Sequence, residues 1–193
     1  MASGNEEQKI ESGFNVVPQT KLPKKDWILL SLRVVTFFAT VSATIVMSLN
    51  KQTKNFVVAT IGTTPITVPL TAKFQHTPAF VYFVVANGIV SLHNLVMIAM
   101  DILGHKFHNR GLQLALIAVL DTMALALASS GDGAATAMAE LGRNGNSHAK
   151  WNKICDKFEA YCNRGGGALI ASFIGLILLL IVTGICSPQV VPL

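Results

Sequence analysis

The sequence predicts an all-α membrane protein in which four transmembrane helices form a bundle. Three observations support this fold class. Hydrophobic residues make up 51% of the 193-residue chain and charged residues only 13%. The mean hydropathy is +0.52, whereas soluble globular chains are less apolar and carry more charge. The apolar residues gather in four blocks, each long enough, at roughly 20 residues, to cross a bilayer as a helix.

Each apolar block has the length of one transmembrane helix. A hydrocarbon core about 30 Å thick takes roughly 20 helical residues, and only helices or closed barrels satisfy every backbone group there. Barrel strands would alternate apolar and polar residues in segments of about ten, and the blocks show no such alternation. The four spans are therefore expected at residues 27–49, 79–100, 111–130 and 167–186.

The polar segments outside the blocks define the tails and the loops. Residues 1–26 are polar and lack the apolar core of a cleavable signal peptide. They are therefore expected to remain as a disordered cytoplasmic tail. Residues 187–193 form a short second tail. The first outer loop is rich in β-branched residues around Gly62 and Pro65, which predicts a short extracellular β-hairpin. The three loops are expected at residues 50–78 (outer), 101–110 (inner) and 131–166 (outer).

Two signals favour cytosolic termini. Lys21, Lys24 and Lys25 adjoin the first span, and positive residues beside a span favour the cytosolic side. Cys155 and Cys162 lie in the second outer loop, and a cysteine pair suits an oxidising exterior. The count of lysine and arginine over all loops leans slightly the other way. The orientation therefore depends on the lysine cluster and the cysteine pair.

Arg33 in the first span and Asp121 in the third are charges at membrane depth. Such charges normally face the bundle and find partners. If both helices enter from the same side, the two residues lie about six and ten residues deep, a difference of roughly 6 Å that an arginine can span. The functional alternative is a proton or ion relay. A clamp that fixes helix order is favoured, because residues 168–185 of the fourth span contain no ionisable group.

Three residues of the second span, Asn87, His93 and Asn94, are expected to form a polar cluster. His93 lies about seven residues from the cytoplasmic end of its span, near the depth of Arg33. We favour an interhelical hydrogen bond for His93 over a metal site, because no second histidine or carboxylate stands at ligand spacing. No metal and no cofactor are therefore expected.

The three cysteines suggest two covalent features. Cys155 and Cys162 are candidates for a disulfide, but a continuous helix would separate their Cα atoms by roughly 10.5 Å, beyond disulfide reach. A bond therefore requires the chain to bend between them, and two free thiols are the alternative. Cys186 ends the fourth span, where it is either palmitoylated or an unmodified thiol.

The sequence lacks the motifs of enzymes and of nucleic-acid-binding proteins. No Ser/His/Asp set, paired carboxylates, zinc-protease motif or nucleotide-binding loop occurs. The net charge is +5, but the basic residues are scattered between apolar blocks, which favours contact with anionic lipid headgroups over nucleic acid. Membrane lipids are thus expected partners, nucleic acid is not, and no enzymatic activity is expected.

Several features occur together in this chain: Arg33, Asp121, the run Phe-Val-Tyr-Phe-Val-Val-Ala-Asn at 80–87, and Trp-Asn-Lys-Ile-Cys at 151–155 followed by Phe158 and Cys162. Together they resemble the plant CASP-like proteins, relatives of the Casparian strip membrane domain proteins, and their first subfamily most. The resemblance begins at about Lys24 and covers the rest of the chain. It implies a four-span plasma-membrane protein of MARVEL-like topology, with cytosolic termini, that associates with itself and its relatives.

The resemblance also implies a function. Family members that form Casparian strips make immobile platforms and guide local wall modification. The first loop here reads Thr-Thr-Pro-Ile-Thr-Val at 63–68 and lacks the acidic and aromatic signature of those members. We therefore expect a self-associating plasma-membrane scaffold that organises membrane domains or recruits cell-wall-modifying partners. A small channel or transporter that uses Asp121 and Arg33 is the first alternative, and a membrane-embedded enzyme is the second.

Overall fold

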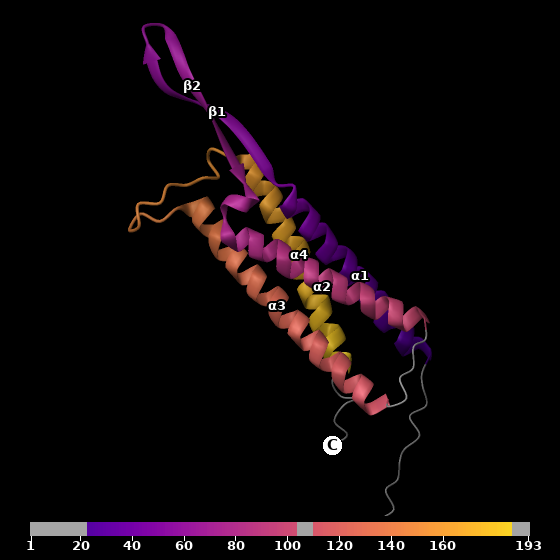
Figure 1. Ribbon diagram of the computed structural model, residues 1–193. Helices are drawn as coiled ribbons and strands as arrows, with labels where there is room; N and C mark the ends of the chain where they lie inside the picture. Colours follow the sequence, from indigo (N-terminus) through magenta and orange to yellow (C-terminus); the bar gives the residue numbers. More distant parts are fainter. Residues whose placement is uncertain (1–22, 104–109, 187–193) are drawn as a thin grey trace, which may run out of the picture.

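The computed structural model is a bundle of four helices with a β-hairpin projecting from one end (Figure 1). It describes residues 23–103 and 110–186. Residues 1–22 of the expected first tail, the whole of the second tail and residues 104–109 of the expected inner loop lie outside the described residues. The elements in chain order are α1 (Pro23–Ser48), β1 (Lys51–Ile61), β2 (Thr64–Lys73), the 3₁₀ turn η1 (Phe74–His76), α2 (Pro78–Leu103), α3 (Arg110–Asn144) and α4 (Glu159–Cys186).

All four helices are long and apolar enough to cross a membrane, judged by length and composition over the described residues. The predicted fold class is therefore confirmed. The first residue of α1 and the last of α4 lie at the same end of the bundle, opposite the hairpin (Figure 1). The last residue of α2 and the first of α3 lie at this end as well (Figure 1).

Each helix turns one narrow stripe of side chains into the bundle. On α1 the buried residues recur at alternating spacings of three and four, so they lie on one face of the helix. The opposite face carries exposed apolar side chains such as Val35, Phe38 and Ile45, as expected of a surface against lipid. The buried stripe of α1 is Arg33, Thr36, Thr40, Ala43, Met47 and, just past the helix, Asn50.

Small residues allow the helices to approach one another closely. A Cβ atom added to Gly175 of α4 would lie 3.0 Å from Cγ2 of Thr40 on α1. One added to Gly131 of α3 would lie 3.0 Å from Cβ of Ala86 on α2. Such contacts are typical of membrane bundles, where van der Waals packing replaces the hydrophobic drive between helices.

The β-hairpin that the sequence predicts is present between α1 and α2. Its strands have 11 and 10 residues and pair antiparallel, from Lys51 opposite Lys73 to Ile61 opposite Thr64. Gly62 has φ of 61° in the two-residue connection, where the tight turns that suit strand twist require positive φ. The register shifts between Val57 and Ala59. The base of the hairpin is held by α4, whereas most of its side chains are exposed.

The expected end of the third span near residue 130 is wrong as a helix boundary, because α3 continues to Asn144. Residues 131–144 are less apolar than the preceding part, but they are rich in alanine, the strongest helix former. The helix ends where Gly145 adopts φ of 68° and its N–H donates to the carbonyl of Leu141, a common left-handed termination.

The expected start of the fourth span at residue 167 is also wrong as a helix boundary. The α4 helix begins at Glu159, so the connection from α3 covers only residues 145–158 in place of 131–166. Three consecutive glycines, Gly165, Gly166 and Gly167, indicate a loop by composition, but they lie inside α4. At the other boundaries the structure differs from the expected spans by four residues or fewer.

Candidate functional site

Arg33 and Asp121 meet inside the bundle near the end that carries the first residues of α1. The guanidinium donates two parallel hydrogen bonds, from Nη1 to Oδ1 of Asp121 at 3.1 Å and from Nη2 to Oδ2 at 2.7 Å. Both side chains are almost fully buried. The paired geometry suits the planar fork of arginine and ties α1 to α3.

His93 of α2 completes this cluster. Its Nε2 lies 2.7 Å from Oδ1 of Asp121, so α1, α2 and α3 meet at one carboxylate. His93 thus lies at the depth of Arg33, as expected from the number of residues between each side chain and the end of its span. Among the described residues no group of three His, Cys, Asp or Glu side chains could hold a metal ion.

The expected polar cluster of α2 divides into separate contacts. Asn87 does not meet His93, because it lies about 9 Å further along the helix. The side chain of Asn94 donates only to the carbonyl of Val90 in its own helix, at 3.0 Å, and its Oδ1 has no partner within the described residues. Ser91 lies between these levels, with its hydroxyl 2.9 Å from Oγ1 of Thr40 on α1.

A second buried polar cluster forms around Ser172 of α4. The Ser172 hydroxyl lies 2.8 Å from Oδ1 of Asn87 and 2.6 Å from Oδ1 of Asp132 on α3. A hydroxyl carries one proton, so it donates to only one of the two oxygens at a time. Asp132 is fully buried and its second oxygen has no hydrogen-bond partner within the described residues. Polar groups are therefore stacked at two depths of the bundle.

The hairpin end of the bundle is fixed by contacts between the hairpin base and α4. Asn50 donates from Nδ2 to the carbonyl of Tyr161 at 2.8 Å, and Oε1 of Gln52 accepts from the Tyr161 N–H at 2.8 Å. The ring of Phe56 packs edge-on against Phe158 with centroids 5.7 Å apart. The direction of the hairpin is thus coupled to the first turn of α4.

The predicted disulfide between Cys155 and Cys162 is confirmed. Cys162 lies in the first turn of α4 and Cys155 in the turn that precedes it, which brings their Cα atoms to 5.6 Å. The chain bends between them, as the bond requires. Cys186 at the other end of α4 is a free, half-buried thiol. Its palmitoylation stays a prediction.

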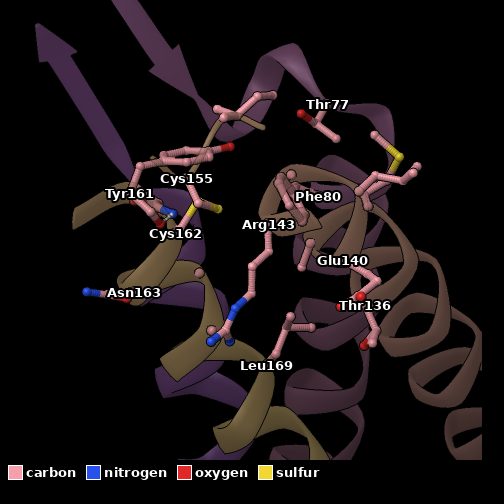
Figure 2. Close-up of a pocket in the computed structure, with 18 of the residues that line it drawn as sticks. Thr77, Phe80, Thr136, Glu140, Arg143, Cys155, Tyr161, Cys162, Asn163 and Leu169 are labelled. Atoms are coloured by element: carbon pink, nitrogen blue, oxygen red, sulfur yellow. Dashed lines mark hydrogen bonds between the residues drawn. A yellow bond between two sulfur atoms is a disulfide. The ribbon is translucent and has the colours of Figure 1, made fainter. Parts of the chain in front are cut away.

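A pocket of about 1000 Å³ opens between α3 and α4 at the hairpin end of the bundle. Figure 2 shows the Arg143 side chain extending into it from α3, with Glu140 and Thr136 on the same helix and Asn163 and Leu169 on the facing helix. Its walls also include the disulfide, Trp151 and the glycine run of α4. The pocket is polar toward the disulfide-bonded loop and apolar toward the middle of the bundle.

A family model for the Casparian strip membrane protein domain matches residues 23–178. The chain belongs to this family. The match includes the buried clusters, the hairpin, the disulfide and the pocket. The resemblance inferred from the sequence motifs is therefore confirmed.

Other family members resemble the chain over almost its whole length. CASP-like protein 1B1 of Glycine max is 67% identical over 183 residues, 95% of this chain and 93% of that protein. CASP-like protein 1B2 of Populus trichocarpa is 62% identical over 92% of this chain and 87% of its own length. CASP-like protein 1B2 of Arabidopsis thaliana is 57% identical over 83% and 82%. No solved structure matches the chain.

Sequence reasoning missed two members of the buried polar clusters of this family member. Asp132 lies outside the expected third span of residues 111–130, and Ser172 has no ionisable group that would mark it as a site residue. A periodic signal for Asp132 exists. Asp121, Ala124, Ala128 and Asp132 recur every three or four residues, which continues the buried face of α3 past residue 130.

Proposed function

We propose that this membrane protein is a self-associating plasma-membrane scaffold, with both termini in the cytosol, that organises membrane domains and recruits cell-wall-modifying partners. The orientation is supported by the disulfide, which lies at the hairpin end of the bundle and suits an oxidising compartment. Lys21, Lys24 and Lys25, at the N-terminal side of the first span, favour the cytosol for the opposite end.

The observation that carries the scaffold proposal is the exposed hairpin. Apolar side chains that are 42–71% exposed line both strands, and each strand has an outer edge whose backbone groups pair with no further strand among the described residues. Unpaired edges and exposed apolar side chains are features that pair with another chain. The exposed apolar residues are Val57, Val58, Ile61, Ile66, Val68 and Leu70.

The mass of the full chain in mild detergent, measured by light scattering and corrected for bound detergent, tests self-association. We expect a discrete oligomer for the wild type and a smaller species for Val57→Lys/Val58→Lys, because this variant replaces two exposed apolar side chains of the proposed contact by charged ones. Asn55→Lys/Thr60→Lys adds the same charge at exposed polar positions of the same strand and is expected to keep the oligomer. A strictly monomeric wild type would contradict the proposal.

The alternative of a small channel or transporter is favoured by one observation. The fourth helix contributes Ser172 to a buried cluster with Asp132, so ionisable groups occur at two depths of the bundle, with Asp121 at the other. A conduction path requires such groups in series. Ion or solute flux in proteoliposomes that disappears in Asp121→Asn would support this alternative, and absence of flux in folded wild-type protein would leave the scaffold.

A further inference from the structure

The pocket between α3 and α4 lies at the boundary between the hydrocarbon core and the lipid headgroups. Counted from Cys186, about 20 residues of α4 cross a core of about 30 Å, which places the far edge of the core near Gly167. Leu169 and Phe173 of the pocket then lie within the hydrocarbon, and Glu159 lies about 12 Å beyond its edge, on the headgroup side. The cavity extends over about 21 Å of helix, from Glu159 to Phe173.

The glycines of α4 leave space in this pocket that no described part of the chain fills. A Cβ atom added to Gly166 or Gly167 would meet nothing within 4 Å, whereas one at Gly165 would lie 3.4 Å from Asn50. Glycine inside a helix destabilises it by about 0.5–1 kcal/mol relative to alanine. Packing within the protomer explains Gly165 but not its two neighbours. An occupant of the pocket would explain them, because side chains there would displace it.

The charges around the pocket indicate the class of the occupant. Arg143 extends into the cavity (Figure 2), and no carboxylate among the described residues lies within ion-pair distance of it. Glu140 and Glu159 also line the cavity, and Glu140 accepts a hydrogen bond from Asn144. One cation and two carboxylates match a headgroup that has one phosphate and one amine, because arginine binds phosphate oxygens and carboxylates accept from ammonium groups.

The deeper wall of the pocket suits an acyl chain. Ile170 and Phe173 are 65% and 39% exposed, and with Gly166 they follow one another at spacings of four and three on one face of α4. The face below the charged residues is therefore apolar and open. We propose that this pocket binds a zwitterionic phospholipid of the leaflet on the hairpin side, with its phosphate on Arg143 and one acyl chain against Ile170 and Phe173.

Photolabelling tests the site. The full chain in mild detergent is incubated with a phosphatidylethanolamine that carries a diazirine on its acyl chain, irradiated, and digested for mass spectrometry. We expect label on the α4 segment around Ile170 and Phe173, and competition by unlabelled phosphatidylethanolamine but not by phosphatidylglycerol. Equal competition by the two lipids, or no label on this segment, would overturn the assignment.

Paired variants separate occupation of the pocket from general effects on folding. Gly166→Leu/Gly167→Leu fills the cavity and should reduce labelling about tenfold, which corresponds to a tenfold weaker affinity. Gly184→Leu is the matched control, because its Cβ also meets open space in α4 but lies at the opposite end of the helix. It should label like the wild type. Undiminished labelling of the filled variant would overturn the proposal.

A second pair of variants tests the headgroup contact without a change of volume at the glycines. Arg143→Gln should weaken labelling several-fold, since a charge-assisted contact to phosphate is lost. Arg164→Gln removes the same charge from an exposed residue outside the pocket lining and should have no effect. Equal labelling of Arg143→Gln and Arg164→Gln would overturn the role of Arg143. This comparison remains decisive even if Gly166→Leu/Gly167→Leu fails to fold.

Discussion

Replacing Asp121 by asparagine should cost this protein about 3 kcal/mol of stability. Asp121 is fully buried and accepts two hydrogen bonds from Arg33 and one contact from His93, at 2.7–3.1 Å. Removing one partner of a buried ion pair typically costs about 3–5 kcal/mol, because the other charge stays buried without compensation. The lower end applies here, since the asparagine oxygen still accepts one hydrogen bond from Arg33.

The free energy of unfolding is measured by titrating sodium dodecyl sulfate into the full chain in mild detergent and following helix content by circular dichroism. Thr122→Ala is the control, because Thr122 is exposed beside Asp121 and its hydroxyl bonds only the Ala118 carbonyl of its own helix. Its loss should stay below about 1 kcal/mol. If Asp121→Asn and Thr122→Ala unfold at the same concentration of sodium dodecyl sulfate, the ion-pair argument is refuted.

The double variant Arg33→Met/Asp121→Asn tests the same reasoning in the opposite direction. Once the arginine is absent, no uncompensated charge stays in the bundle, and apolar replacement of buried ion pairs is often close to neutral. We expect the double variant to be more stable than Asp121→Asn alone. If the losses of the two single variants simply add, the two side chains are not coupled.

Four further changes have expected outcomes. Cys155→Ala/Cys162→Ala removes a disulfide that joins cysteines 7 positions apart in the sequence. The chain-entropy model gives a loss of stability of about 2.5 kcal/mol, which should lower the midpoint of thermal unfolding. An unchanged midpoint would contradict this prediction. Ser172→Ala leaves buried oxygens without a hydroxyl partner and should cost about 1–3 kcal/mol in the detergent titration. Gly131→Ala should destabilise by about 1–3 kcal/mol, because its Cβ would lie 3.0 Å from a neighbouring side chain. A Cβ atom added to Gly133 would meet nothing within 4 Å, so Gly133→Ala should instead stabilise the protein by about 0.5–1 kcal/mol. Equal effects of Gly131→Ala and Gly133→Ala on stability would refute the packing argument.

The four spans and the Arg33–Asp121 contact could be predicted because both follow from the cost of polar groups in hydrocarbon. Apolar blocks have the length of the bilayer core, and two opposite charges at similar depth have few other partners. The disulfide could be proposed from spacing only on condition that the chain bends. Hydropathy thus determines the parts of this fold that the membrane itself constrains.

The helix ends and the second polar cluster could not be predicted by the same reasoning. A helix does not stop where the hydrocarbon stops, so α3 continues through the alanine-rich residues 131–144 and α4 begins eight residues before Gly167. By hydropathy alone, Asp132 therefore falls in the expected outer loop of residues 131–166. Its contact with Ser172 joins residues 40 positions apart, which no local pattern contains. The pocket likewise depends on how α3 and α4 diverge in space.

Because the hairpin is long, a small rotation of the bundle would move the hairpin tip over a large distance. Ten strand residues at about 3.3 Å each place the Gly62 tip roughly 33 Å from the base at Lys51 and Lys73. Because that base is bonded to Tyr161 of α4, a tilt of about 10° there would sweep the tip through about 6 Å. The tip would act as the end of a lever, and a contact that holds it in place would also restrict the tilt of α4 in the membrane.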